Sequence, residues 1–221
     1  MKNLKSAFTL AEILVSLAII GVIAAVTLPA LNTDVSKRAV ETQIVKFYNT
    51  VTNAAEQFKN DSQVDSLADL DMNDDDVSGF LSYFKSSGVC PSFTSQGCFA
   101  STYTNAVGTK VNTANVLSGA GTARYLQDGS VFAVLGANSS GIRIAVDING
   151  AKKPNRFGYD FWRIAVLPDG SVDSVGMIGM DRSDTTKMSD YLQNKAAPDC
   201  REDGLNDCFA HIKRNNFKLD D

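Results

Sequence analysis

The chain opens with MKNLKSA at residues 1–7 and runs directly into FTLAEILVSLAIIGVIAAVTLPAL at residues 8–31. The second stretch is apolar apart from one carboxylate, Glu12. A helix over it spans roughly 36 Å, against about 30 Å for the hydrocarbon core of a bilayer. Lys2 and Lys5 precede the apolar run, as positive charges on the cytoplasmic side of a membrane span do. The pattern predicts one membrane-spanning helix.

The carboxylate of Glu12 is the unusual feature of this predicted span. A charged side chain at the centre of a membrane helix costs about 2.5 to 3.5 kcal/mol on insertion scales, so it indicates a function and a partner. A cleaved secretory signal does not fit, because the residues that follow Pro29 do not form a small-residue cleavage site. A permanent signal anchor explains the lysines but leaves Glu12 unexplained.

The stretch SAFTLAEIL at residues 6–14 resembles the cleavage and methylation motif of type IV prepilins and type II secretion pseudopilins. The resemblance implies that a membrane peptidase cuts between Ala7 and Phe8, and that the new Phe8 amine is methylated. It also implies assembly roles for Glu12 and for a helix-kinking Pro29. Ala7 stands where the family usually has glycine, and because alanine is also small we expect slower cutting at most.

The resemblance also implies the partners of the chain. These are a prepilin peptidase and methyltransferase, other pilin or pseudopilin subunits that bind through the N-terminal helix, and an inner-membrane assembly platform. Once Phe8 is the N-terminus, its amine is a cation among apolar helices, and such a buried charge needs a partner. We expect Glu12 of a neighbouring subunit to supply it, which sets an axial stagger between adjacent subunits.

Helical periodicity continues beyond Pro29, because apolar residues recur at spacings of three and four through residues 40–58. We therefore expect one long helix from Thr9 to Asn60, kinked near Pro29. The expected organisation has three parts. It comprises a cytoplasmic leader at 1–7, a transmembrane or filament-core helix at 8–31, and a head at 32–221 that lies outside the cytoplasm and includes the second half of the helix.

Five strand signals follow one another in the second half of the chain. They lie at residues 123–127, 130–135, 142–148, 161–167 and 171–177. Asp128 and Gly129 between the first two are typical of a hairpin turn. Sequential strands with turns between them predict an antiparallel meander. The sequence thus predicts an α+β protein with the pilin-like fold, a long kinked N-terminal helix packed on a small antiparallel sheet.

The sequence between the helix and the strands is less regular. An acidic segment at 61–76 predicts a solvated loop, and a short helix is expected over 76–86. The region 90–123 is rich in Ser, Thr, Asn and Gly, which predicts irregular structure with one short strand. We expect Trp162 in the core and His211 on a short C-terminal helix.

The four cysteines form two local pairs, Cys90 with Cys98 and Cys200 with Cys208. Four cysteines allow three connectivities, but short local loops and an exported head favour the two nearest-neighbour disulfides. Zinc is the alternative. Its cysteine ligands are usually about two to four residues apart, and the single histidine, His211, adds little support.

The segment DINGAKKPNRFGYD at residues 147–160 is the strongest candidate for chemistry in the head. Asp147, Asn149, Asn155 and Asp160 offer oxygen atoms beside glycine turns, and calcium prefers such oxygen ligands. Their spacing does not match the EF-hand loop. Calcium is therefore the candidate ligand, and no other cofactor is expected. The alternative is that these side chains only cap turns through their own backbone.

Motifs and charge exclude several function classes. The chain has one histidine and lacks the nucleophile-elbow and phosphate-loop motifs, so we do not expect an enzyme. A net charge of -4 without a block of Lys or Arg argues against nucleic-acid binding.

We interpret the chain as a structural subunit of a type IV pilus or type II secretion pseudopilus. It is expected in the bacterial cytoplasmic membrane with its head outside the cytoplasm, and then in the filament. The alternative is a permanently anchored, single-span binding protein of the surface or periplasm that does not polymerise. A minor pilin for DNA uptake is a third interpretation, and the sequence leaves the type of filament open.

Overall fold

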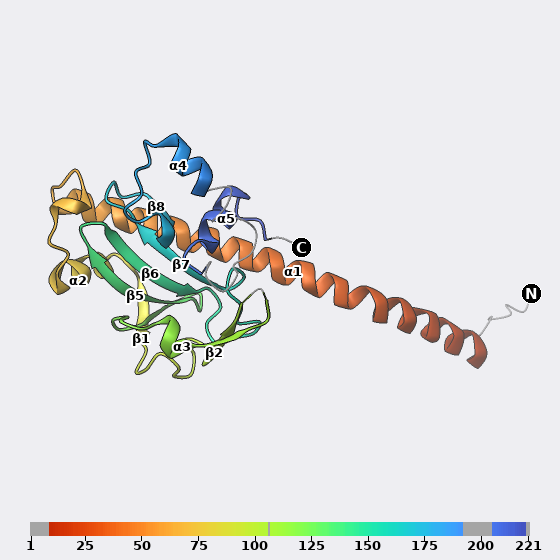
Figure 1. Cartoon of the computed structure of the whole chain (residues 1–221). Helices are drawn as coiled ribbons and strands as arrows, with labels where there is room; N and C mark the ends of the chain where they lie inside the picture. The colour runs from red at the N-terminus through yellow and green to blue at the C-terminus, as the bar shows by residue number, and fades with distance from the viewer. Residues whose placement is uncertain (1–8, 106, 192–204, 220–221) are drawn as a thin grey trace, which may run out of the picture. The chain divides into compact units, whose positions relative to one another are not determined.

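The longest element is helix α1 (Leu10–Asp61), which confirms the long helix predicted from Thr9 to Asn60 (Figure 1). The structure is a computed structural model, and it describes residues 9–105, 107–191 and 205–219. The chain divides into two compact units, residues 1–39 and 40–221, and α1 contributes to both. The two units are described separately below.

The second unit is built on a six-stranded sheet with the strand order β1-β4-β5-β6-β7-β8. All neighbouring strands in it are antiparallel. The strands of this sheet are β1 (Ser86–Val89), β4 (Arg124–Leu126), β5 (Val131–Asn138), β6 (Gly141–Asp147), β7 (Phe161–Val166) and β8 (Val172–Ser174). A separate two-stranded sheet pairs β2 (Thr102–Thr104) with β3 (Lys110–Asn112). Strands β4 to β8 confirm the predicted meander.

Short helices connect and flank the strands. They are η1 (Leu67–Asp69), α2 (Asp74–Ser82), α3 (Thr113–Val116), η2 (Val175–Met177), α4 (Thr185–Asp190) and α5 (Cys208–Arg214). Helix α2 starts two residues before the predicted Asp76. The reason is a cap at residue 73, because the Asp76 backbone N–H donates to Asn73 Oδ1 at 3.0 Å and Asp76 Oδ2 accepts from the Asn73 N–H at 3.2 Å. Helix α5 contains His211, as predicted.

The central strands bury both of their faces, and side chains alternate between them. One face is formed by Phe132 and Val134 of β5, Ile142, Ile144 and Val146 of β6, and Trp162, Ile164 and Val166 of β7. The other face presents Val131 and Ala133 of β5, Ala145 of β6 and Phe161 of β7. Trp162 is 1% exposed, which confirms its predicted place in the core.

The second half of α1 covers the first of these faces. Its buried side chains recur at helical spacing and join the same apolar cluster, and they are Val40, Ile44, Phe47, Val51, Ala54, Ala55 and Phe58. The ring centroids of Phe47 and Phe132 lie 5.8 Å apart, which brings helix and sheet into direct contact. Because the apolar stripe of the helix lies on the apolar face of the sheet, each element removes the other from water.

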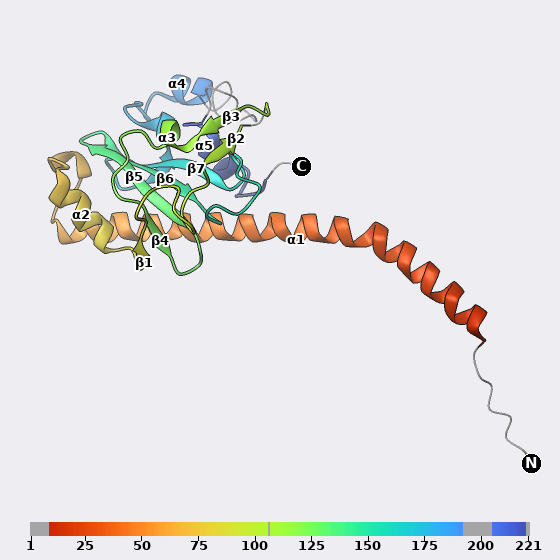
Figure 2. The same ribbon diagram turned by 90° about the horizontal axis from the view of Figure 1, so that it is seen from below.

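A second layer covers the opposite face of the sheet. In Figure 2 the sheet lies between the second half of α1 and the segment that carries β2, β3 and α3. The side chains of this layer that join the apolar cluster include Phe99, Tyr103, Val116, Leu117 and Phe157. The region predicted as irregular with one short strand therefore holds a two-stranded sheet and a helical turn. Strands of three residues are too short to show a period in the sequence.

The last described residues of the chain bind α1 within the second unit through a hydrogen bond and an ion pair. Glu41 is 7% exposed. Its Oε1 accepts a hydrogen bond from the Leu219 backbone N–H at 3.0 Å, and its Oε2 lies 2.9 Å from Lys218 Nζ. The buried carboxylate is thus satisfied by one backbone donor and one cation.

Cys90 and Cys98 form a disulfide, as predicted. It closes a loop beside the apolar cluster that contains Phe99 and Tyr103, and both cysteines are buried in that cluster. Cys200 lies outside the described residues, so its predicted bond to Cys208 stays a prediction.

Removing the Phe132 ring tests the contact between helix and sheet. The side chain is fully buried, and its ring lies 4.7 Å from that of Phe84 as well as near Phe47. We expect Phe132→Ala to lower the free energy of unfolding by about 3 to 5 kcal/mol. Denaturant unfolding of the full chain, followed by the fluorescence of its single tryptophan, measures this change. The control Val107→Ala, at a side chain that is 58% exposed, should stay within about 0.5 kcal/mol of wild type.

The disulfide is expected to stabilise the head through its short loop. The double variant C90S/C98S should lose up to about 2.6 kcal/mol of unfolding free energy by the loop-entropy estimate. Peptide mapping of the unreduced wild-type chain checks the bond directly. Recovery of Cys90 linked to Cys200 or to Cys208 would contradict the local pairing.

Candidate functional site

The N-terminal motif is described from Thr9 onward, and the predicted cleavage residues Ala7 and Phe8 lie outside the described residues. Thr9 and Glu12 cap the start of α1 reciprocally. Glu12 Oε2 accepts from the Thr9 backbone N–H and from the Thr9 hydroxyl, both at 2.8 Å. In return, the Glu12 backbone N–H donates to Thr9 Oγ1 at 3.3 Å. This is a capping box, which satisfies donors that the first turn of a helix leaves unpaired.

Thr9 is a residue that sequence reasoning missed. A Ser or Thr followed by an acid three positions later, just before an apolar run, is a recognisable helix start. That signal was present in the sequence as Thr9, Leu10, Ala11 and Glu12. The structure therefore gives Glu12 a local partner as well as the intersubunit partner that the resemblance implies.

The first turns of α1 carry a set of exposed apolar side chains. Their exposed fractions run from 47% to 81%, and they are Leu10, Ile13, Leu14, Val15, Leu17, Ile19, Ile20, Val22 and Ile23. Apolar surface of this extent marks an interaction site on a protein. Ser16 interrupts it, and its hydroxyl is satisfied by the Glu12 carbonyl at 2.8 Å.

Two expectations about this helix, the kink at Pro29 and the membrane span, involve residues that the structure describes only in part. Pro29 lies within α1, but its side chain is outside the described atoms, so the kink there stays a prediction. Within the part of the chain that the structure describes, we find no helix with the length and hydropathy of a membrane span.

The four predicted oxygen ligands of the head come from the start and end of one connection, residues 148–160 between β6 and β7. Asp147 ends β6, and Asp160 immediately precedes β7. Asn149 bridges the two ends, because its backbone N–H donates to Asp147 Oδ1 at 3.1 Å and its Nδ2 donates to Asp160 Oδ2 at 3.3 Å. The structure thus brings Asp147, Asn149 and Asp160 together, and the Asn155 backbone joins them through an N–H bond of 2.8 Å to Asp160 Oδ2.

Both carboxylates of this connection are fully buried, at 0% exposure. Burial raises the pKa of Asp147 well above its ordinary value, and the nearby charge of Asp160 raises it further. Burial also raises the pKa of Asp160, although the backbone N–H groups of Arg156 and Asn155 oppose the shift. In the described residues no Lys or Arg forms an ion pair with either acid.

Tyr103 is a further residue of this cluster that the sequence did not indicate. Its hydroxyl donates to Asp147 Oδ2 from strand β2, which lies far away in the chain. Burial beside Asp147 raises the pKa of Tyr103, so the phenol stays protonated and remains a donor. In the described residues, no three or more His, Cys, Asp and Glu side chains gather in a way that could hold a metal.

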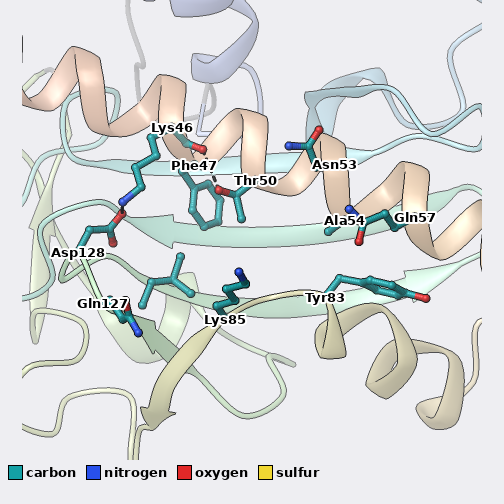
Figure 3. Close-up of a pocket in the computed structure, with 11 residues that line it drawn as sticks. Lys46, Phe47, Thr50, Asn53, Ala54, Gln57, Tyr83, Lys85, Gln127 and Asp128 are labelled. Carbon is teal, nitrogen blue, oxygen red and sulfur yellow. Dashed lines mark hydrogen bonds and ion pairs between the residues drawn. The ribbon is translucent and has the colours of Figure 1, made fainter.

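The second unit also carries a surface groove between α1 and the segments around β1 and β4 (Figure 3). Its volume is about 400 Å³, and its lining includes Lys46, Asn53, Gln57, Tyr83 and Lys85. Lys46 Nζ pairs with Asp128 Oδ2 at 2.7 Å across one end. Most of the lining side chains carry a polar group, and they come from three separate parts of the chain, so no local motif could have indicated the groove.

Residues 2–28 match the family described as the prokaryotic N-terminal methylation motif. No curated protein and no solved structure matches the chain. The matched range contains the predicted cleavage point and Glu12, and it ends before Pro29. The match supports the identification of this chain as a type IV pilin-like or pseudopilin precursor, and the antiparallel head beneath a long N-terminal helix is consistent with the pilin-like fold.

Proposed function

We propose that this protein is a structural subunit of a type IV pilus or type II secretion pseudopilus. It is processed before Phe8, N-methylated there, and assembled through the first half of α1. The observation that carries the proposal is the methylation motif at residues 2–28, joined to a helix whose apolar side chains are exposed in the single chain. A prepilin peptidase, other pilin subunits and an assembly platform are the partners that the motif implies.

Exposed apolar surface on α1 supports assembly through this helix. Side chains such as Leu14, Leu17 and Ile20 are 59%, 60% and 62% exposed in the single chain, and burying an exposed side chain of this kind stabilises by up to about 1.5 to 3 kcal/mol. A bundle of equivalent helices or a membrane removes the same surface from water. On this proposal the apolar side chains are buried first in the cytoplasmic membrane and then in the helix bundle of the filament.

The geometry of Glu12 fits the proposed charge pairing. Both bonds from Thr9 end on Oε2, and among the described residues no donor is recorded on Oε1. The carboxylate also lies in the first turn of the helix, at the end where the helix dipole favours negative charge. Glu12 can therefore hold its own helix cap with one oxygen and accept the Phe8 amine of a neighbouring subunit with the other.

The disulfide in the head supports a location outside the cytoplasm. Disulfides persist in oxidising compartments and are rare where thiol reductants are abundant. The bond between Cys90 and Cys98 therefore fits a head that is exported while residues 8–31 stay in the membrane or filament. The pilin-type motif indicates a structural protein rather than an enzyme.

The groove of the second unit favours a second candidate, a permanently anchored binding protein. A concave site of about 400 Å³ is large enough for a small ligand. In that case residues 1–7 would remain attached and the helix would serve only as an anchor. Pairing between subunits would then play no part. Substitution of Glu12 therefore distinguishes the two candidate functions.

Substitution of Glu12 tests the proposed pairing. Glu12→Ala should leave the amount of membrane-inserted precursor unchanged and abolish its incorporation into filaments, because the neighbouring amine loses its counter-charge. Filaments sheared from cells and quantified by immunoblot, next to the membrane fraction of the same cells, measure both.

A matched variant separates the charge from the helix cap. Glu12→Gln keeps an oxygen that can accept from Thr9, since Glu and Gln both complete a capping box. We expect it to fail in assembly as Glu12→Ala does. Normal filaments from Glu12→Gln would contradict the proposed charge pairing, whether or not Glu12→Ala also assembles.

A further inference from the structure

Two basic side chains lie on the outer face of the layer formed by β2, β3 and the β6–β7 connection. Thr104 of β2 pairs with Lys110 of β3 on one side and forms an isolated parallel bridge with Arg156 on the other. Residues directly opposite each other in neighbouring strands point to the same face. The other face of β2 carries Tyr103, which is buried in the apolar cluster. Lys110 and Arg156 therefore lie on the solvent side, about 10 Å apart across two strand spacings.

The same connection adds two more cations, and the resulting basic patch comprises Lys110, Lys152, Lys153 and Arg156. All four side chains are exposed, and among the described residues none of them forms an ion pair. The acids of the connection, Asp147 and Asp160, are fully buried, so the cations reach solvent and the carboxylates do not. The whole chain has a net charge of -4, so this patch is opposite in sign to the rest of the protein. A cluster of like charges favours an anionic partner.

The basic patch lies at the end of the sheet where α1 enters the head. Lys46 Nζ pairs at 2.7 Å with Asp128, which comes just before β5, and β5 starts beside the residue where β6 ends. Further along the helix, Lys59 Nζ donates at 3.1 Å to the carbonyl of Asp169, which follows β7 at the opposite end of the sheet. Helix α1 therefore runs away from the β6–β7 connection. Val40, the first residue of the head unit, shares its end of the sheet with the patch.

The proposed function brings this end of the head close to a membrane. On that proposal residues 8–31 lie in the bilayer before assembly, and residues 32–39 separate them from the head unit. These eight residues belong to α1, and they span about 12 Å as a helix. The start of the head therefore stays near the lipid headgroups in any orientation of the head. The connecting residues carry two further cations, Lys37 and Arg38, and one acid, Asp34.

We propose that the basic patch binds the phosphate groups of anionic phospholipids in the outer leaflet of the cytoplasmic membrane while the subunit is still membrane-inserted. The inference rests on the proposed function, because it requires the first half of α1 in the bilayer. Ammonium and guanidinium groups bind phosphate oxygens through charge-assisted hydrogen bonds. Each Lys or Arg near an anionic membrane surface favours the bound state by about fivefold, within a Debye length of the surface. The four contacts orient the head with its β2–β3 layer toward the membrane.

A nucleic acid is the other polyanion that a basic patch could bind, and two observations favour the membrane. Proteins that bind DNA commonly neutralise about six to ten phosphates, which is more than four side chains supply. The net charge of -4 also repels a polyanion that approaches the whole chain from solution. A membrane surface needs no such approach, because α1 already holds the head beside it.

Acetylation of lysines in the reconstituted full chain tests the contact. Vesicles of phosphatidylcholine alone are compared with vesicles that also contain phosphatidylglycerol, and flotation on a density gradient shows how much chain is membrane-bound in each. A membrane-impermeant acetylating reagent and peptide mass spectrometry then give the rate at each lysine. Lys152 and Lys153 should react about fivefold more slowly on the anionic vesicles. High salt should abolish the difference, since it screens the attraction.

Lys187 is the internal control for this comparison. Its side chain is 70% exposed, and it follows Arg182, whose partner Asp169 lies at the opposite end of the sheet from the patch. Its rate should be the same on both types of vesicle. A general effect of anionic lipid on the reagent would instead slow all exposed lysines alike.

Two variants with the same change of charge separate the patch from net charge. In K152Q/K153Q, Lys110 is the remaining reporter, and anionic vesicles should no longer slow its acetylation. In the matched control K85Q/K187Q, which removes two exposed lysines outside the patch, Lys110 should still be slowed as in wild type. Equal slowing of Lys110 in both variants would contradict a role for Lys152 and Lys153. The wild-type comparison stands even if a variant fails to fold.

The outcomes distinguish this inference from the proposed function. If the chain floats with both types of vesicle and the patch lysines react equally on them, the lipid contact is wrong and the membrane anchor stands. Flotation with anionic vesicles alone, with the patch lysines slowed, would support the contact and contradict the anchor. Flotation with neither would contradict both. Slowing of the same lysines by duplex DNA, with no effect of anionic lipid, would overturn the lipid contact and assign the patch to nucleic acid.

Discussion

The head depends on burial of both faces of the sheet formed by β5, β6 and β7. A sheet that is apolar on both sides must be covered by two layers, and in this chain the two layers come from different segments. The second half of α1 supplies one layer with Phe47 and its helical neighbours. The segment that carries β2, β3 and α3 supplies the other with Phe99 and Tyr103. Removal of either layer would expose a continuous apolar surface, so the helix is part of the core of the head.

The first half of the same helix differs from the second half in the exposure of its apolar side chains. Residues 40–58 contribute buried side chains to the head, whereas the apolar side chains from Leu10 to Ile23 are exposed. On our proposal a membrane or other subunits cover them. The capping box at Thr9 and Glu12 starts the helix with a carboxylate that is satisfied locally. A carboxylate that already has donors is less costly in an apolar setting, which helps to explain how an acid is tolerated there. On our proposal its second oxygen serves assembly.

The sequence predicted the features that depend on local patterns. Helical periodicity predicted α1, alternation and turn residues predicted β4 to β8, and close spacing predicted the bond between Cys90 and Cys98. It predicted one short strand where the structure has the paired strands β2 and β3, because three-residue strands carry no period and form through contacts distant in the chain. It grouped Asp147, Asn149, Asn155 and Asp160 by composition. The structure was needed to show that Asp147, Asn149 and Asp160 lie together in one connection, and to reveal Tyr103.

The central claim is that the helix becomes an assembly element only after the leader is removed. Intact-mass spectrometry of the protein isolated from its native cells tests this most directly. Our account predicts a chain that lacks residues 1–7 and carries one methyl group on the amine of Phe8. A chain that keeps residues 1–7, with no methyl group, would contradict the account and favour the permanently anchored binding protein.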